Sequence, residues 1–211
     1  MLSEELLHYA EQHSSPELPF LQRLNRETNL TQMYPRMMAG PVQGMILRFI
    51  SHMLKPKRIL EIGTFTGYSG INFALGLPED GILHTMDVDP ELEEGIRKYL
   101  AEAGVEKKVI LHTGEAEKII PTLKETWDLV YIDADKPNYL KYYKLVFDKV
   151  RPGGFILADN ALWDGKVLEA HPRSLDTKGI KEFNEFILKD ERVENLLLPF
   201  RDGVMICRKI A

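Results

Sequence analysis

Apolar and polar segments alternate regularly along this chain from residue 58 to residue 158. Short apolar runs rich in β-branched and aromatic residues, typical of buried parallel strands, are separated by segments with the apolar spacing of helices. We expect the strands at 58–62, 82–87, 108–112, 129–133 and 155–158. We expect the intervening helices at 68–76, 90–103, 115–124 and 139–150. Helical crossovers of this length allow parallel pairing, so the pattern predicts a Rossmann-like, doubly wound α/β fold.

The C-terminal part departs from this alternation. A further helix is expected at 178–190, and apolar runs follow at 193–199 and 204–209. The runs are joined by Arg201-Asp202-Gly203, a turn sequence with Asp-Gly at its centre. Strands joined by so short a turn pair antiparallel, so the sheet should be mixed and should end in an antiparallel hairpin. Residues 167–177 lack periodicity and should form a surface loop that could cover a site.

The N-terminal part also has a helical pattern. A helix is expected at 16–28, with Ser14 or Ser15 as its N-cap and Pro16 at its first position. After a polar connector, a second helix is expected at 40–54. These elements predict a helical extension ahead of the alternating core.

Length and composition agree with a single domain. The 211 residues, 44% of them hydrophobic, can bury a sizeable core. We therefore expect one domain over 1–211, made of an N-terminal helical extension at 1–55 and a Rossmann-like core at 56–211. The net charge of -5 and the lack of a Lys/Arg block argue against nucleic acid as a partner.

Cysteine content and hydropathy indicate the compartment. Cys207 is the only cysteine, so an internal disulfide and a cysteine zinc framework are both excluded, as suits a reducing cytoplasm. The start, Met1-Leu2-Ser3-Glu4-Glu5, lacks the basic region of a secretion signal, and no apolar run reaches the ~18 residues of a membrane span. None of the six histidines has a metal-ligand spacing. We expect a cytoplasmic protein without a membrane partner.

Carboxylates follow two of the expected strands directly. Asp133 ends the run 129–133, and Asp159 and Asn160 follow the run 155–158. The carboxyl ends of parallel strands are where ligands bind in open α/β sheets, so these hard oxygen donors should converge. A cluster of carboxylates is costly to bury unless a cation neutralises it, which predicts a divalent cation. The alternative is that these side chains only cap loops.

The first strand leads into a glycine-containing turn and a helix. Gly63 and Gly67 allow a sharp turn and close approach of a ligand, but Gly-x-Gly-x-x-Gly and the phosphate-binding Gly-Lys-[Ser/Thr] are both absent. Glu61 would repel a pyrophosphate but can accept hydrogen bonds from an ammonium group. Asp87 ends the second strand, where an acidic side chain can bind ribose hydroxyls. A cationic, phosphate-free nucleoside ligand fits these residues, although each motif alone is weak.

Longer motifs combine these residues. They are Glu61-Ile62-Gly63-Thr64-Phe65-Thr66-Gly67-Tyr68-Ser69, Tyr131-Ile132-Asp133-Ala134-Asp135-Lys136-Pro137-Asn138-Tyr139, Asp159-Asn160-Ala161-Leu162-Trp163, and Leu198-Pro199-Phe200-Arg201-Asp202-Gly203 with Cys207-Arg208. Together they closely resemble the metal-dependent S-adenosylmethionine O-methyltransferases of the caffeoyl-CoA and catechol type. The resemblance extends from about Ser15 to the end of the sequence.

This resemblance implies a class I methyltransferase fold, a homodimer, and roles for individual residues. It implies contacts to S-adenosylmethionine from Glu61, Gly63, Thr64, Ser69, Asp87, Ala116 and Asp135. It implies that Asp133, Asp159 and Asn160 ligate Mg²⁺, with Mn²⁺ or Ca²⁺ as alternatives. Lys136 would be the general base; a lysine in a turn before a proline is otherwise commonly just exposed. Two positions depart from the plant enzymes: Asp164 replaces an acceptor-contacting asparagine, and Ala39 replaces a donor-contacting threonine.

The expected activity is methyl transfer to one hydroxyl of a catechol-like small molecule, either a free phenolic or a CoA ester. An acceptor oxygen can attack a sulfonium methyl group in line, so positioning is much of the catalysis. An NAD-type Rossmann oxidoreductase and a non-catalytic nucleoside-binding protein are the alternatives. The missing glycine pattern argues against the first, and the carboxylate set with Lys136 argues against the second. The sequence leaves the physiological acceptor, its regiochemistry and the metal open.

Overall fold

The computed structural model describes residues 4–210, which form two compact units. Unit 1 consists of Arg58–Gly63 and the chain from Glu115 onward. Unit 2 consists of the chain up to Lys57 and Thr64–Gly114. The single-domain division expected from the sequence stays a prediction.

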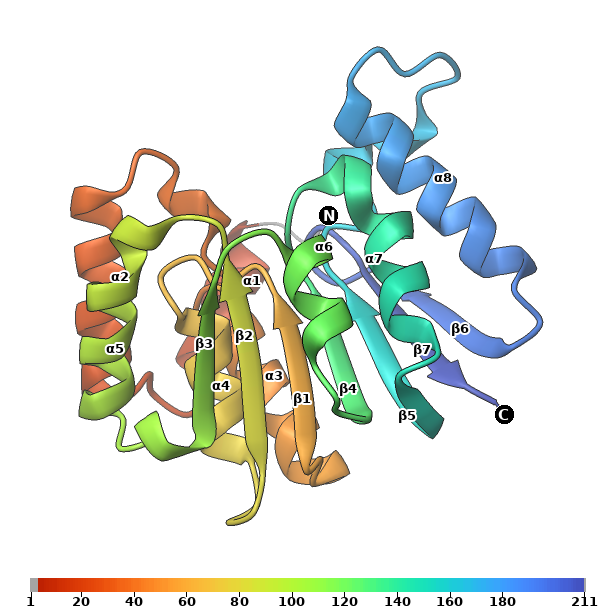
Figure 1. The fold of residues 1–211 in the computed structure, drawn as a ribbon. Helices are drawn as coiled ribbons and strands as arrows, with labels where there is room; N and C mark the ends of the chain where they lie inside the picture. The colour runs from red at the N-terminus through yellow and green to blue at the C-terminus, as the bar shows by residue number, and fades with distance from the viewer. Residues whose placement is uncertain (1–3, 211) are drawn as a thin grey trace. The chain divides into compact units, whose positions relative to one another are not determined.

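Within residues 4–210, seven strands form one sheet in the order β3-β2-β1-β4-β5-β7-β6 (Figure 1). The strands are β1 (Arg58–Ile62), β2 (Ile82–Asp87), β3 (Val109–Thr113), β4 (Trp127–Ile132), β5 (Val150–Ala158), β6 (Val193–Leu198) and β7 (Val204–Lys209). In unit 1, β4 pairs in parallel with β1 and β5, whereas β7 pairs antiparallel with β5 and β6. In unit 2, β2 and β3 are parallel. The predicted mixed α/β sheet with its C-terminal antiparallel hairpin is confirmed.

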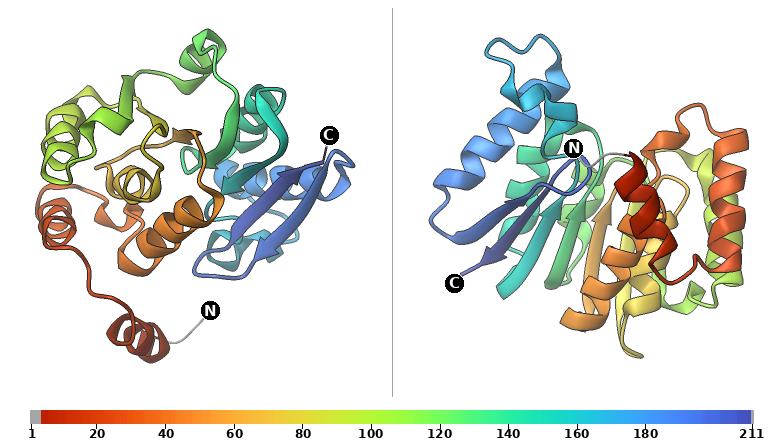
Figure 2. Two further views of the ribbon diagram at one scale, coloured as in Figure 1. Left: turned by 90° about the horizontal axis from the view of Figure 1, so that it is seen from below. Right: turned by 180° about the vertical axis from the view of Figure 1, so that it is seen from behind.

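The helices of unit 1 lie on one face of its strands (Figures 1 and 2). They are α6 (Ala116–Ile119), α7 (Tyr139–Phe147) and α8 (Leu175–Lys189), with short 3₁₀ turns η4 (Ile120–Thr122), η5 (Lys136–Asn138) and η6 (Trp163–Leu168). Their core contains Tyr139, Tyr143 and Phe183, whose rings meet edge to face and are fully buried. Such aromatic contacts add to the stabilisation from buried apolar area and fix α8 against α7.

The helices of unit 2 include the N-terminal extension. They are α1 (Glu4–Gln12), α2 (Pro19–Thr31), α3 (Pro41–Leu54), α4 (Tyr68–Gly76) and α5 (Glu93–Glu102), with 3₁₀ turns η1 (Pro35–Met37), η2 (Pro90–Leu92) and η3 (Glu106–Lys108). An extended segment joins α1 to α2 (Figure 2). Glu27 of α2 accepts hydrogen bonds from Lys98 and Tyr99 of α5, which ties these two helices together. None of the helices described here is long and apolar enough to cross a membrane.

Two expected helix starts were wrong. The helix expected from Pro16 begins at Pro19, because Leu18 is extended, as residues before proline prefer, and Ser14 donates to the carbonyl of Ala10 instead of capping. The last helix begins at Leu175, three residues earlier than expected, and its N-cap is Ser174. The aperiodic loop at 167–177 is therefore shorter than expected, since η6 and α8 occupy both of its ends.

Other helices and strands begin or end at residues that differ from the expected ones. The first expected connector begins later, because α2 continues to Thr31. Strand β5 starts at Val150, five residues earlier than expected, and so includes the residue that was expected to end the preceding helix, since α7 stops at Phe147. The remaining strand ends differ from the expected ones by one or two residues, and β1, β2 and β7 match them. These shifts leave the strand order and the positions of the carboxylates unchanged.

Two helical glycines provide an opposed pair of stability tests. A Cβ at Gly76 would lie 2.5 Å from the Cβ of Ser51 and 2.6 Å from the carbonyl oxygen of Arg48, whereas one at Gly95 would meet nothing within 4 Å. We expect Gly76→Ala to lower the free energy of unfolding by ~1–3 kcal/mol, because α3 and α4 must separate. We expect Gly95→Ala to raise it by ~0.5–1 kcal/mol through helix propensity. Urea denaturation of both variants measures this, and equal effects would contradict the close α3–α4 packing.

Candidate active site

Two carboxylates leave adjacent strands of unit 1 at the same level. Ile132 of β4 is paired with Ala158 of β5, so Asp133 and Asp159 each follow one member of a parallel pair. The backbone ladder continues through them, because Asp133 N–H donates to Ile62 at 2.8 Å and Asp159 N–H donates to Ile132 at 3.0 Å. The structure therefore brings Asp133 and Asp159 together at the carboxyl edge, as the sequence predicted from strand polarity.

The Asp159 carboxylate, only 5% exposed, is held by hydrogen bonds within unit 1. The Tyr131 hydroxyl donates to its Oδ2 at 3.0 Å, and the Asn160 N–H donates to its Oδ1 at 2.8 Å. Asn160 itself has a left-handed backbone with φ 55°. Its side chain and that of Asp159 thus leave the end of β5 in a fixed arrangement.

Lys136 lies beside these carboxylates and is 9% exposed. Its Nζ donates to Asp133 Oδ1 at 3.1 Å and to the Tyr139 hydroxyl at 2.7 Å. The same Nζ lies 4.9 Å from the ring centre of Tyr139 and 5.7 Å from that of Trp163. The lysine predicted as a general base is therefore buried, and carboxylate, hydroxyl and aromatic groups surround it.

Helix α8 supports the turn that carries Lys136. A Cβ at Gly179 would lie 2.6 Å from the Lys136 carbonyl oxygen and 2.6 Å from Pro137 Cα, so only glycine allows this approach. Phe183, one turn further along, meets the Tyr139 ring edge to face at 5.8 Å. The lysine and its hydroxyl partner are thus both positioned from α8.

Burial shifts the protonation equilibria of this cluster. Desolvation raises the pKa of Asp133 to about 6; the charge of Lys136 opposes this shift, and the charge of Asp159 adds to it. The pKa values of Tyr131 and Tyr139 are raised well above the usual value, mainly by burial and also by the neighbouring carboxylates. Both phenols therefore stay protonated and can donate hydrogen bonds at neutral pH.

The donor set Asp133, Asp159 and Asn160 has the chemistry that a hard divalent cation requires, namely two carboxylates and one amide oxygen. Among residues 4–210, no three or more His, Cys, Asp or Glu side chains cluster as a metal site. Asn160 Nδ2 donates a hydrogen bond to Asp202 Oδ2 at 3.2 Å, so the amide oxygen of Asn160 points away from Asp202. One oxygen of Asp133 accepts from Lys136, which leaves the second as a donor to a cation. These residues therefore fit a hard divalent cation.

Two residues expected at the methyl donor lie at the end of β1 in unit 1. Glu61 is fully buried in the strand. Gly63 has φ 101°, and a Cβ there would overlap the carbonyl oxygen of Asp133. The glycine therefore lets the chain leave β1 directly against the turn that follows β4.

Two more of the expected donor contacts lie after β3 and β4. Ala116 is the buried first residue of α6, where helix N–H groups lack partners within the helix. The Asp135 carboxylate accepts from the Tyr142 hydroxyl and from Asn138 Nδ2, each at 2.5 Å. Its position is thus fixed from α7 and η5.

The remaining expected donor residues lie in unit 2. Thr64 N–H donates to a β2 carbonyl at 3.1 Å, which anchors the start of the glycine-containing turn. The Asp87 carboxylate accepts the backbone N–H of Phe65 at 2.7 Å and that of Asp89 at 3.1 Å. Ser69 is buried in the first turn of α4. Backbone donors thus orient Asp87 at the end of β2, as a ribose-binding carboxylate requires.

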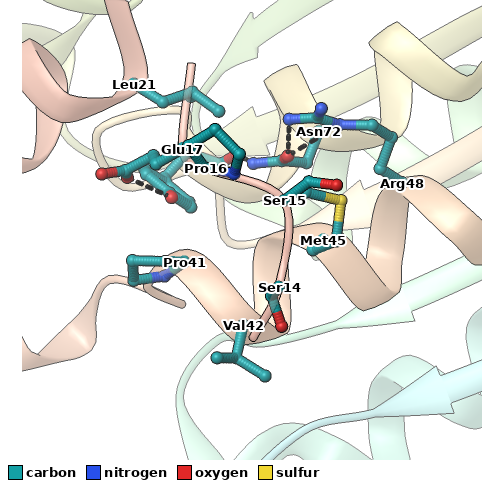
Figure 3. A pocket seen from close by; sticks show the side chains of 11 residues that line it. Ser14, Ser15, Pro16, Glu17, Leu21, Pro41, Val42, Met45, Arg48 and Asn72 are labelled. Atoms are coloured by element: carbon teal, nitrogen blue, oxygen red, sulfur yellow. Dashed lines mark hydrogen bonds between the residues drawn. The ribbon is translucent and has the colours of Figure 1, made fainter. Parts of the chain in front are cut away.

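Unit 2 also contains a small pocket of about 200 Å³, and none of the expected site residues lines it (Figure 3). Tyr68 donates its hydroxyl to Glu17 at 2.5 Å, and Arg48 donates to Asn72 Oδ1 at 2.7 and 3.2 Å. The lining residues are Ser14, Ser15, Pro16, Glu17, Leu21, Pro41, Val42, Met45, Arg48, Tyr68 and Asn72. These contacts tie the segment before α2 to α4 and α3 to α4.

Sequence reasoning missed three residues of the unit 1 cluster. Tyr131 precedes Asp133 by two positions, so strand alternation placed it on the same face and could have identified it. Tyr139 lies three residues after Lys136, within reach across one turn. Asp202 is distant in the sequence from the residue that it contacts, and no local pattern indicates it.

Known proteins are similar in sequence to most of this chain. A family model described as O-methyltransferase matches residues 11–210. Caffeoyl-CoA O-methyltransferase 5 of Nicotiana tabacum is 33% identical over 208 residues, covering 92% of this chain and 86% of the relative. Catechol O-methyltransferase domain-containing protein 1 of Mus musculus is 36% identical over 210 residues, covering 97% and 80%.

Solved structures agree with the sequence comparison. The O-methyltransferase TomG of Streptomyces achromogenes, in complex with SAM, has a TM-score of 0.93 at 28% identity, over 100% of both chains. An O-methyltransferase of Bacillus cereus, in complex with SAH, has a TM-score of 0.91 at 27% identity, over 97% of both. The similarity in sequence and in structure therefore covers nearly all of this chain.

The raised pKa of Asp133 predicts a pH-dependent stability. Between the ordinary pKa of 3.8 and about 6, the folded protein binds more protons at Asp133 than the unfolded chain does. The free energy of unfolding should therefore fall as the pH rises through this window, by up to about 3 kcal/mol. In Asp133→Asn this contribution should disappear.

Urea denaturation from pH 4 to pH 7 in EDTA measures this difference between the two proteins. Asp80→Asn removes an exposed aspartate that pairs with Lys57 and is the matched control. Parallel stability curves for the wild type and Asp133→Asn would show that Asp133 is not desolvated as described.

Proposed function

Because this chain belongs to the O-methyltransferase family and is an S-adenosylmethionine-dependent enzyme, we propose that it uses a divalent cation to methylate one hydroxyl of a catechol-like small molecule. One observation carries the proposal: Asp133 and Asp159 emerge side by side from β4 and β5, with Lys136 Nζ 3.1 Å from Asp133. Carboxylates and a buried lysine are the groups needed to bind a cation and to accept a phenolic proton. Membership of an enzyme family argues against the alternative of a non-catalytic nucleoside-binding protein. The similar solved structure that contains SAM argues against the alternative of an NAD-dependent oxidoreductase.

In this proposal, Asp133, Asp159 and Asn160 hold the cation. A bound divalent cation would favour the phenolate over the phenol, whose reference pKa is about 10. Lys136 is the general base that takes the proton from the acceptor hydroxyl, because its Nζ lies 3.1 Å from Asp133, one of the residues that would hold the cation. Tyr139 holds Lys136 Nζ in place at 2.7 Å.

We assign the methyl donor to the residues that the sequence resemblance implied. These are Glu61, Gly63, Thr64, Ser69, Asp87, Ala116 and Asp135. The fixed Asp87 carboxylate would accept the ribose hydroxyls, and Glu61 would accept from the ammonium group of the donor. Since the sulfonium methyl group is already activated, these residues act by placing it in line with the acceptor oxygen.

The proposal names the chemical class of the methyl acceptor. The Trp163 ring, 5.7 Å from Lys136 Nζ, offers an aromatic wall beside the base. The relatives include caffeoyl-CoA O-methyltransferases and a catechol O-methyltransferase domain-containing protein, so a CoA ester and a free vicinal diphenol are both included in the proposal. The homodimer and the cytoplasmic location stay predictions.

Removal of the cation should abolish activity. With S-adenosylmethionine and a panel of vicinal diphenols and their CoA esters, mass detection should show the gain of one methyl group. EDTA should lower the rate by at least ~10²-fold, because a metal in such a site supplies several kcal/mol. Added Mg²⁺ should restore the rate. Full turnover after exhaustive chelation would remove the cation from the proposal while leaving the methyltransferase assignment intact.

Replacement of the base should separate turnover from donor binding. We expect Lys136→Ala to lower kcat by ~10²–10⁴-fold, the usual contribution of a general base. The Kd for S-adenosylhomocysteine, measured by calorimetry, should stay close to that of the wild type, because Lys136 is not among the donor residues. Lys144→Ala, at an exposed lysine on α7, is the matched control and should retain wild-type kcat. A near-normal kcat for Lys136→Ala would exclude it as the base.

A further inference from the structure

The segment after β5 is held by the turn between β6 and β7. Ala161 N–H donates to the Gly203 carbonyl at 2.9 Å, and Leu162 N–H donates to the Asp202 carbonyl at 2.8 Å. Gly203 has φ 83°, and a Cβ there would lie 2.5 Å from Leu162 Cγ. The two backbones are therefore packed directly against each other, and both belong to unit 1.

The segment does not have a locally favourable backbone. Asn160, Trp163 and Asp164 have φ values of 55°, 47° and 52°, in the left-handed region. Asparagine and aspartate tolerate this region, but tryptophan rarely adopts it. The conformation that places Asn160 and Trp163 therefore depends on contacts from outside the segment.

The side chain of Asp202 supplies two of these contacts. Its Oδ2 accepts from Asn160 Nδ2 at 3.2 Å, and its Oδ1 accepts from the backbone N–H of Asp164. Both partners are donors and each meets a different oxygen, an arrangement that suits a carboxylate, which has two acceptor oxygens and no donor. By drawing Nδ2 toward itself, Asp202 also fixes the side of the amide on which the Asn160 oxygen lies.

We propose that Asp202 is a positioning residue for the cation site, acting through Asn160. The inference rests on the proposed function, in which the Asn160 oxygen is a cation ligand. Partners that orient metal ligands typically contribute 10–100-fold to metal affinity. Asp202 is suited to this role because its two hydrogen bonds set both the Asn160 amide and the backbone that follows.

Asp202→Asn is an isosteric test of this role. The new amide has one oxygen for two donors, so its nitrogen must face either the Asn160 nitrogen or the Asp164 N–H. In the first case the Asn160 amide turns over and its oxygen leaves the cation. We expect ~10–100-fold weaker Mn²⁺ binding, measured on the full chain by the decrease of the free Mn²⁺ electron paramagnetic resonance signal.

A matched control separates orientation from charge. Asp164→Asn removes the same charge from the residue whose backbone N–H donates to Asp202, and it keeps that N–H, because asparagine tolerates a φ of 52°. If orientation matters, Asp202→Asn should weaken Mn²⁺ binding much more than Asp164→Asn. Equal losses would show that Asp202 acts only through its charge and would overturn the inference.

A reciprocal exchange guards against simple misfolding. In Asn160→Asp combined with Asp202→Asn, the new amide at 202 donates to the new carboxylate at 160 and still accepts from Asp164. Mn²⁺ binding should recover by at least ~10-fold relative to Asp202→Asn, since the ligand oxygen is oriented again. Asn160→Asp alone places the carboxylates of residues 160 and 202 against each other. This single variant should therefore not show the Mn²⁺ binding that the double variant recovers.

The outcomes distinguish this inference from the proposed function. Wild-type protein that binds no Mn²⁺ at millimolar concentration would overturn the proposed cation site, and the inference with it. Wild-type binding that Asp202→Asn changes by less than about twofold would overturn the inference alone. A loss in Asp202→Asn that the reciprocal exchange does not recover would also count against orientation by Asp202.

Discussion

The parallel ladder between β4 and β5 is the constraint on which the candidate site depends. Pairing of Ile132 with Ala158 fixes the register, so Asp133 and Asp159 must leave the sheet at the same edge. A shift of the register by one residue would turn one of these side chains to the opposite face of the sheet. The burial that locks this register, with Trp127 and Tyr131 fully enclosed, also desolvates the carboxylates. Burial of these strands therefore both stabilises the core and alters the chemistry of the carboxylates.

Desolvation explains why the carboxylates are surrounded by donors. A buried charge is costly unless it is paired or hydrogen-bonded, and here Tyr131 donates to Asp159 while Lys136 donates to Asp133. Compensation is incomplete, since the pKa of Asp133 is still raised to about 6. An additional positive charge would complete it. This balance links the physical cost of the cluster to the cation proposed to bind there.

Backbone contacts at glycines place the site more directly than side-chain packing does. Gly63 allows the end of β1 to touch the Asp133 carbonyl, and Gly179 allows α8 to touch the Lys136 carbonyl. Gly203 brings the β6–β7 turn against the segment that contains Asn160. In each case a β-carbon would force apart two backbones that carry functional groups. Rigid elements with little spare volume hold such groups more accurately than mobile loops.

Hydrophobic period and strand polarity were sufficient to predict the strand series, the antiparallel hairpin and the edge that gathers Asp133, Asp159 and Asn160. They were sufficient because period and polarity are local properties of the chain. The start of α2 was not predictable locally, since Pro16 and Pro19 both suit a first helical position and tertiary contacts of Glu17 and Tyr68 accompany the later one. Only the tertiary structure decided that Tyr139 holds Lys136 from a helix fixed by α8, and that Asp202 meets Asn160. Those contacts join residues far apart in sequence or depend on side-chain burial, and neither leaves a periodic signal.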